Sequence, residues 1–192
     1  AIVFELAHLN GLEENFIEWL EKHNHFCNSL VDRIVPGKPD AAAKQKLESE
    51  LGYQDDLIAM SEVYRLWAIE GDEKVKAALS FASVDAGVVI TNDITVFKEL
   101  KLRMLNGTHS LSCGVAFLSG ITSVKEAMDN ATVSAFIKNL MTEEIAKAIP
   151  YDLPQADAQA FAAKVLDRFR NPSIEHHWIN ITLNFTQKLE MR

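Results

Sequence analysis

The sequence has 192 residues, 48% of them hydrophobic, and a formal net charge of −8 at pH 7. This hydrophobic fraction is enough for a folded core, and the acidic balance, with no long basic run, excludes nucleic acid as a partner. No uncharged apolar stretch is as long as the roughly 18 residues of a membrane-spanning helix, so we expect no membrane partner. Cys27 and Cys113 lie far apart in apolar surroundings, which is typical of reduced thiols in a cytoplasmic protein.

The N-terminal part of the sequence is typical of helices separated by turns. Apolar residues at helical spacing predict a helix over residues 2–9 and an amphipathic helix over residues 13–24. The stretch 41–51 is rich in alanine, lysine and glutamate, which predicts a solvated helix without chemistry. His23 and His25 form a His-x-His pair, but in a helix their rings point roughly 200° apart. Since no further ligands accompany them, we expect no metal site.

Two short stretches rich in β-branched and aromatic residues predict strands. They span Val63 to Ile69 and Gly87 to Ile90, and we expect them to form a small hairpin-like pair. Trp67 and Glu70 either line a pocket or, as the more common role, pack in the core. The rest of the pattern is helical. The predicted fold class is therefore mainly α, a multi-helical domain with a minor β pair.

The stretch 101–120 is mostly apolar but carries three polar side chains that need an explanation. If it is one helix turning 100° per residue, Lys101, Asn106 and His109 fall within an arc of roughly 140° and point toward one cavity. Burial lowers the pKa of a lysine, and a carboxylate or developing oxyanion raises it again, which makes a lysine usable as an acid or base. The alternative is structural: a lysine that snorkels, a bend at Asn106-Gly107 and a core histidine.

The C-terminal part predicts further helices. Ser123 and Glu126 have the spacing of a capping box at the start of a short helix. Helical spacing of apolar residues then predicts helices over residues 132–149 and 155–169, separated by prolines. We expect a final helix to begin at Asn171-Pro172 and run to Lys188.

Three blocks of sequence resemble one enzyme family. The pattern Lys-x4-Asn-x2-His at Lys101, Asn106 and His109 is the first. The second, FCNSLVDRIVPG over residues 26–37, resembles an Asn-Ser-x-Val-Asp-Arg-Ile block, and the third, RFRNPSIEH over residues 168–176, resembles an Arg-Phe-x-Asn-Pro block. In this order they resemble the polyol-specific long-chain dehydrogenases. This family includes mannitol dehydrogenase and the hexuronate reductases, and the similarity to the hexuronate-reducing members is the strongest.

The resemblance implies a site and a fold. It makes Lys101, Asn106 and His109 the catalytic residues, and residues 1–192 a helical substrate-binding domain like the C-terminal domain of 6-phosphogluconate dehydrogenase-like enzymes. The substrate is a small sugar acid, the cofactor is NAD, and no metal takes part. The residues that the resemblance places at the substrate are Asn28, Val31, Asp32, Arg168, Asn171 and His176.

Arginines in the matching blocks have two interpretations. A guanidinium group suits the planar carboxylate of a sugar acid because two donors meet two oxygens, which favours Arg168 or Arg170. Alternatively, these arginines interact with the last carbonyl groups of a helix. Arg33 pairs either with Asp32 or with an anionic substrate.

The glycines bear on the cofactor. A dinucleotide-binding half needs a glycine-rich turn of the GxGxxG kind, and the eight glycines never approach that spacing. We therefore expect the N-terminal Rossmann domain of the family to be absent from this chain, which is then a fragment and inactive alone, with that domain as its partner. Two alternatives stay open: reduction of another ketose within the same family, and a non-catalytic helical interaction domain.

Overall fold

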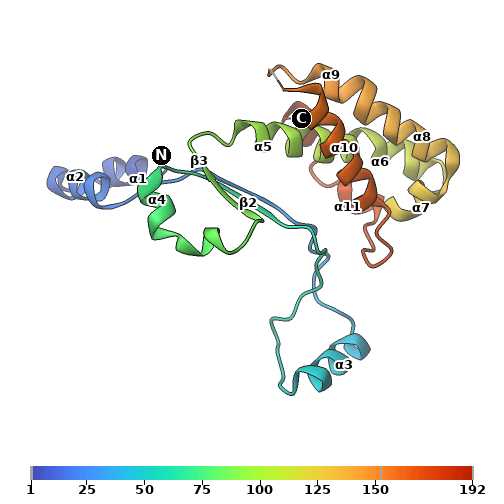
Figure 1. Cartoon of the computed structure of the whole chain (residues 1–192), viewed down its shortest axis with the longest axis horizontal. Coiled ribbons are helices and arrows are strands. Elements are labelled where there is room, and N and C mark those ends of the chain that lie inside the picture. The colour runs from blue at the N-terminus through green and yellow to red at the C-terminus, as the bar shows by residue number, and fades with distance from the viewer. Residues whose placement is uncertain (1, 152, 192) are drawn as a thin grey trace.

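The structure is a computed structural model that describes residues 2–151 and 153–191. Figure 1 shows an elongated molecule with helices α1 (Ile2–Leu9) and α2 (Glu14–His23) at one end and most of the C-terminal helices gathered at the other. A small sheet lies between the two ends, and α3 (Ala41–Leu51) projects from it on long connections. The sheet is therefore the element that joins the N-terminal half to the helical half.

The sheet has three strands in the order β1-β2-β3. β1 (Ser29–Asp32) pairs antiparallel with β2 (Leu66–Glu70), and β2 pairs parallel with β3 (Val88–Thr91). The expected hairpin-like pair is therefore wrong. A parallel pair needs a crossover, which is provided here by α4 (Glu73–Ala78) and the 3₁₀-helix η1 (Ser80–Ser83). The predicted fold class, mainly helical with a small sheet, is confirmed.

Three predicted helices have the expected bounds: α1, α3 and α10. In α3 and α10 the ends carry clear signals. α3 begins after Asp40, whose side chain accepts a hydrogen bond from Ala43 N at 2.8 Å. It ends at Gly52, where φ is 78°, a conformation that favours glycine. α10 (Gln155–Phe169) starts directly after Pro154, as the helix-breaking ring predicts.

The central stretch is not one α-helix. It consists of α5 (Thr95–Glu99), the π-helix η2 (Leu100–Gly107) and α6 (Thr108–Leu118). Hydrogen bonds in a π-helix run from i to i+5, so each turn holds more residues than an α-helical turn. The predicted arc of side chains, which assumed α-helical rotation throughout, is therefore wrong for the part that carries Lys101 and Asn106.

A second π-helix interrupts the helix predicted over residues 132–149. The run consists of α8 (Ala131–Asn139), the π-helix η3 (Leu140–Ile145) and α9 (Ala146–Ala148). Before it, α7 (Val124–Asp129) begins at Ser123, whose hydroxyl accepts from Glu126 N at 3.1 Å as predicted. The Glu126 carboxylate accepts from Thr122 N at 2.8 Å.

The predicted final helix is wrong as well. Asn171 begins a turn in which its side-chain oxygen accepts from Ser173 N at 2.9 Å. The chain becomes helical only at α11 (Trp178–Ile181), and Asn184, with φ at 57°, separates this helix from α12 (Phe185–Met191).

One hydrophobic core fills the helical half. It contains Met104, Cys113, Ile137, Met141, Val165 and Trp178, all fully buried and drawn from η2, α6, α8, η3, α10 and α11. Among the described residues no helix has the length and apolar character needed to cross a membrane. The core thus fixes η2, and with it Lys101, against α10 and η3.

Candidate active site

Lys101 reaches from the helical half to the sheet. It lies on η2, and its Nζ donates a hydrogen bond to the carbonyl oxygen of Val31 on β1. The pairing of β1 with β2 explains why this carbonyl is accessible. Hydrogen-bonded and non-hydrogen-bonded residue pairs alternate along an antiparallel ladder. The pair of Asn28 and Glu70 is hydrogen-bonded, because Glu70 N donates to Asn28 O at 2.8 Å, so the pair three positions further along β1 is not. Val31, opposite Trp67, therefore directs its carbonyl away from β2.

His109 lies in a buried aromatic cluster. It is on α6, and its ring stacks on Phe169 with 4.3 Å between ring centroids. The rings of His176 and Trp178 meet it edge-on at 5.0 and 6.0 Å. Burial, reinforced by the nearby charges of His177 and Lys188, lowers the pKa of His176 below its ordinary value. The structure thus brings together two histidines that the sequence placed in separate blocks.

Arg168 is held by two carboxylates. Its NH1 and NH2 donate to the two oxygens of Asp32 at 2.9 and 2.8 Å, and its Nε and NH2 donate to Glu62 at 3.0 and 2.7 Å. The guanidinium also lies 4.3 Å from the centroid of the Tyr64 ring. Burial alone would lower the pKa of Arg168, but the hydrogen bonds and charges of Asp32 and Glu62 outweigh it and raise that pKa.

The buried ionic cluster consists of Asp32, Glu62 and Arg168. It gives two predicted substrate contacts, Asp32 and Arg168, partners within the protein. The sequence offered Arg168 as a ligand for the carboxylate of a sugar acid, and Asp32 as a substrate contact. In the structure each binds the other, and the cluster is at most 8% exposed. The role of both residues at a substrate stays a prediction.

The remaining predicted substrate residues make local contacts. Asn28 Nδ2 donates to Glu70 Oε1 at 3.2 Å, and Asn171 closes the turn described above. Arg170 is exposed and pairs with Asp167 at 3.4 Å, whereas Arg33 Nε donates to the carbonyl of Glu62 at 2.9 Å. Of the predicted residues, the structure therefore joins three pairs: Lys101 with Val31, Asp32 with Arg168, and His109 with His176.

Sequence analysis missed Glu62 and Tyr64. Both precede β2 and contact Arg168, which lies 106 positions beyond Glu62. The only local signal is that Glu62 is an isolated acidic residue at the entrance to an aromatic and β-branched strand. That signal is too weak to distinguish a buried partner from an exposed charge.

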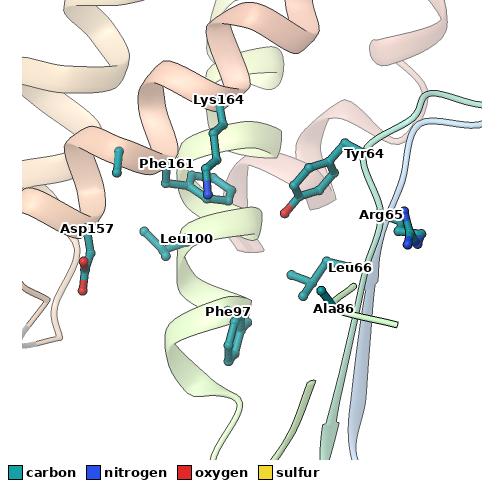
Figure 2. A pocket seen from close by; sticks show the side chains of 10 residues that line it. Tyr64, Arg65, Leu66, Ala86, Phe97, Leu100, Asp157, Phe161 and Lys164 are labelled. Carbon is teal, nitrogen blue, oxygen red and sulfur yellow. The ribbon is translucent and has the colours of Figure 1, made fainter. Parts of the chain in front are cut away.

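Two of the cavities border Arg168 or the Tyr64 ring that it contacts. One, of about 360 Å³, is lined on the sheet side by Tyr64 and Leu66 and on the helix side by Phe97, Leu100 and Phe161. Figure 2 shows the hydroxyl of Tyr64 and the amine of Lys164 directed into it. A second cavity of about 10 Å³ touches Arg168, Phe169 and His176, and this volume holds about one water molecule. Neither cavity is lined by Lys101, Asn106 and His109.

A cluster of metal ligands and a glycine-rich phosphate-binding turn are the two local signs of a cofactor site. Within residues 2–151 and 153–191 no group of three or more His, Cys, Asp or Glu side chains has the arrangement of a metal site. No turn with the GxGxxG spacing is present in the sequence, and such a turn is what cradles the pyrophosphate of NAD.

Solved structures define the class of fold. D-sorbitol dehydrogenase in substrate-free form aligns with a TM-score of 0.76 at 24% identity, over 97% of this chain and 37% of that one. Mannitol 2-dehydrogenase of Pseudomonas fluorescens, solved with NAD and D-mannitol, aligns with a TM-score of 0.64 at 26% identity, over 87% of this chain and 33% of that one. The chain has the fold of part of a polyol dehydrogenase.

Family models identify the family. The mannitol dehydrogenase C-terminal domain matches residues 93–192, and the mannitol dehydrogenase Rossmann domain matches residues 2–83. The chain belongs to the mannitol dehydrogenase family. The contact between Lys101 and Val31 joins the two matched regions. How the chain divides into domains, and whether residues 1–192 act as one substrate-binding domain, stays a prediction.

Curated relatives point to a particular branch of the family. The altronate oxidoreductase of Bacillus subtilis (strain 168) is 40% identical over 99% of this chain. The altronate oxidoreductase of Shigella flexneri is 41% identical over 100% of this chain. The chain spans only 38% and 39% of the lengths of these relatives.

Proposed function

We propose that this chain is the substrate-binding and catalytic part of an NAD-dependent oxidoreductase that interconverts tagaturonate and altronate. The relatives named altronate oxidoreductase, at 40% and 41% identity, support the substrate. The observation that carries the mechanism is the hydrogen bond from Lys101 Nζ to the Val31 carbonyl. A lysine oriented by a fixed main-chain acceptor is suited to a directed proton transfer.

Lys101 is the proton-transfer group in this proposal. NADH, when bound, would supply the hydride for ketone reduction, and Lys101 donates a proton to the carbonyl oxygen. An ammonium has three N–H donors, and the bond to Val31 O uses one of them. In the direction of oxidation, Lys101 accepts the proton of the hydroxyl group.

Asn106 and His109 complete the catalytic set. Asn106, half-buried on η2, donates a hydrogen bond to the developing alkoxide, a contribution of roughly 2.7–4 kcal/mol. His109 holds the substrate oxygen or orients Lys101, since stacking on Phe169 fixes the plane of its ring. Asn28, Val31, Asp32, Arg168, Asn171 and His176 remain the proposed substrate contacts.

The first prediction concerns Lys101→Ala in a full-length enzyme carrying this sequence. We expect NADH oxidation with tagaturonate to be abolished, because the proton donor is lost, while NADH binding measured by fluorescence is retained. Lys98→Ala is the matched control, since Lys98 is exposed and lies one turn earlier on α5; this variant should keep full turnover. Unchanged turnover in Lys101→Ala would refute the assignment.

A second substrate within the same family is tested in the same assay. The structural similarity to mannitol 2-dehydrogenase, at a TM-score of 0.64, favours a family-wide mechanism that also suits fructuronate reduction or mannitol oxidation. Parallel assays with tagaturonate, fructuronate and fructose separate these substrates. A preference for fructuronate or fructose would retain the role of Lys101 and replace tagaturonate as the substrate.

A further inference from the structure

Glu62 holds the residues that follow β1. Its backbone N–H donates to the Ile34 carbonyl at 3.0 Å, and its Oε1 accepts from the Ile34 N–H at 2.7 Å. Its own carbonyl accepts from Arg33 Nε at 2.9 Å. With 3% of its surface exposed, Glu62 is a buried carboxylate whose main chain and side chain both bind residues 33–34.

The same carboxylate holds β1 by a second route. It accepts from Nε and NH2 of Arg168 at 3.0 and 2.7 Å, and that guanidinium binds both oxygens of Asp32. Arg168 comes from the end of α10 and is stacked on Tyr64. Asp32 is therefore fixed from the helical half, and Glu62 fixes the position of the arginine that binds it.

These contacts bear on the partner of Lys101. The carbonyl of Val31 and the backbone nitrogen of Asp32 belong to one peptide group, which is planar and does not rotate about its C–N bond. Holding Asp32 from its side chain and Ile34 from its backbone therefore fixes the direction of the Val31 carbonyl. That carbonyl accepts the hydrogen bond from Lys101 Nζ.

We propose that Glu62 is a positioning residue for the proton transfer by Lys101, acting through Arg168, Asp32 and the Val31–Asp32 peptide. It touches neither the lysine nor the substrate. Its work is to keep the Val31 carbonyl in the orientation that directs the Lys101 ammonium to the substrate oxygen. The proposal rests on the proposed function of Lys101.

Glu62→Gln in the full-length enzyme tests this role. The amide keeps the shape of the side chain but directs an NH₂ group at the donors of Arg168. We expect kcat for ketose reduction to fall by about 10- to 100-fold, the effect of a small misplacement of a catalytic group, with an unchanged Kd for NADH. The isotope effect on kcat with NADH deuterated at the transferred position should rise. The pH midpoint of kcat should move to lower pH, because the Val31 carbonyl favours the charged form of the Lys101 amine and a displaced carbonyl favours it less.

The matched control is Glu48→Gln on α3. Like Glu62, Glu48 accepts from a backbone N–H, that of Asp55 at 3.0 Å, and pairs with a cation, Lys44 at 3.3 Å. This variant should have the kcat, isotope effect and pH midpoint of the unaltered enzyme. A purely structural role for Glu62 would lower the amount of folded enzyme only. The proposal would therefore be overturned if Glu62→Gln had an unchanged isotope effect, an unchanged pH midpoint and an unchanged kcat, with kcat calculated from the concentration of NADH-binding sites.

Glu62→Asp keeps the test decisive if the glutamine variant does not fold. It retains the charge but withdraws the carboxylate by one methylene group, so we expect a smaller fall in kcat with the same direction of pH shift. Wild-type kcat and pH midpoint in Glu62→Asp would overturn the proposal. Lys101→Ala, assayed alongside, separates the two hypotheses: if it is active the proposed function fails, and if it is inactive while the Glu62 variants behave normally only the positioning role fails.

Discussion

Charge balance within the buried ionic cluster of Asp32, Glu62 and Arg168 bears on substrate recognition. Two carboxylates and one guanidinium sum to −2 + 1 = −1, and all three side chains are at most 7% exposed. Taking charges out of water is costly, and their mutual pairing offsets that cost. A sugar carboxylate that binds here would add a further negative charge to a cluster that already has more negative than positive charges. A contact between Arg168 and that carboxylate therefore carries an electrostatic cost as long as the cluster is intact.

His176 predicts a pH dependence of stability. Its pKa in the folded protein is lowered from the ordinary value of 6.5 by burial, whereas the unfolded chain titrates near that value. The unfolding free energy that this residue contributes is complete above pH 6.5 and is lost as the pH falls toward the lower folded pKa, because only the unfolded state gains a proton. The slope is at most about 1.4 kcal/mol per pH unit.

Urea unfolding of His176→Gln between about pH 7 and pH 5 measures this contribution. We expect the variant to lose less stability over this interval than the unaltered protein. His23→Gln is the control, since His23 is exposed on α2, and it should retain the original slope. If the His176 variant shows the same slope as His23→Gln, burial does not control the titration of His176.

At the scale of elements, the π-helix η2 sets the direction of Lys101. Lys101 and Asn106 lie on η2, whereas His109 lies on the α-helix that follows. A π-helix in a longer helical run changes the rotation between the residues before and after it. The relation between the lysine and the histidine is therefore a property of the helix type as well as of the spacing in sequence.

Deleting Arg103 tests the importance of this geometry. Removal of one residue should restore i→i+4 hydrogen bonds and rotate Lys101 by roughly 100° relative to His109, away from Val31. We expect NADH oxidation by the full-length enzyme to be lost, while circular dichroism shows unchanged helix content. Arg103→Ala is the matched control: it removes the same side chain and its ion pair with Glu99 but keeps the register, so activity should persist. An active deletion variant would contradict a role for η2.

Particular elements show what the sequence could predict. α3 and α10 were predictable at their bounds because Asp40, Gly52 and Pro154 are local signals. β1 was not, since SLVD has no strong alternation and its partner Leu66–Glu70 is distant in sequence. The two π-helices were not, because the apolar spacing that reveals a helix does not separate one turn type from another.

The candidate site shows the same contrast between local sequence signals and contacts of distant residues. Lys101, Asn106 and His109 could be proposed because they form a local pattern, and Val31 and Asp32 because they lie in a recognisable block. The pairing of Glu62 with Arg168 depends on residues 106 positions apart. Such a contact follows from the packing of the residues before β2 against the end of α10, which a single sequence does not specify.

At the scale of the whole molecule, two long-range contacts join the sheet to the helices. Lys101 binds Val31, and Arg168 binds Asp32 and Glu62. In each case one partner lies in the match to the Rossmann domain and the other in the match to the C-terminal domain. The proposed catalytic lysine is therefore positioned by both matched regions together.

The 192-residue chain alone is predicted to be inactive. Its glycines do not form the turn that binds a pyrophosphate, so we expect no NADH oxidation with tagaturonate and no heat of NADH binding by isothermal titration calorimetry. The full-length enzyme, assayed in parallel, should show both. Turnover by the chain alone would mean that NAD binds to residues other than those of a glycine-rich turn.

The use of a main-chain oxygen to hold Lys101 has an evolutionary consequence. Every amino acid at position 31 supplies a carbonyl, so a substitution there alters the side chain beside the lysine without deleting the acceptor of its hydrogen bond. Val31 itself is 57% exposed, which leaves room for other side chains. Evolution can therefore change the side chain at residue 31 while the acceptor that holds the proposed proton-transfer residue is kept.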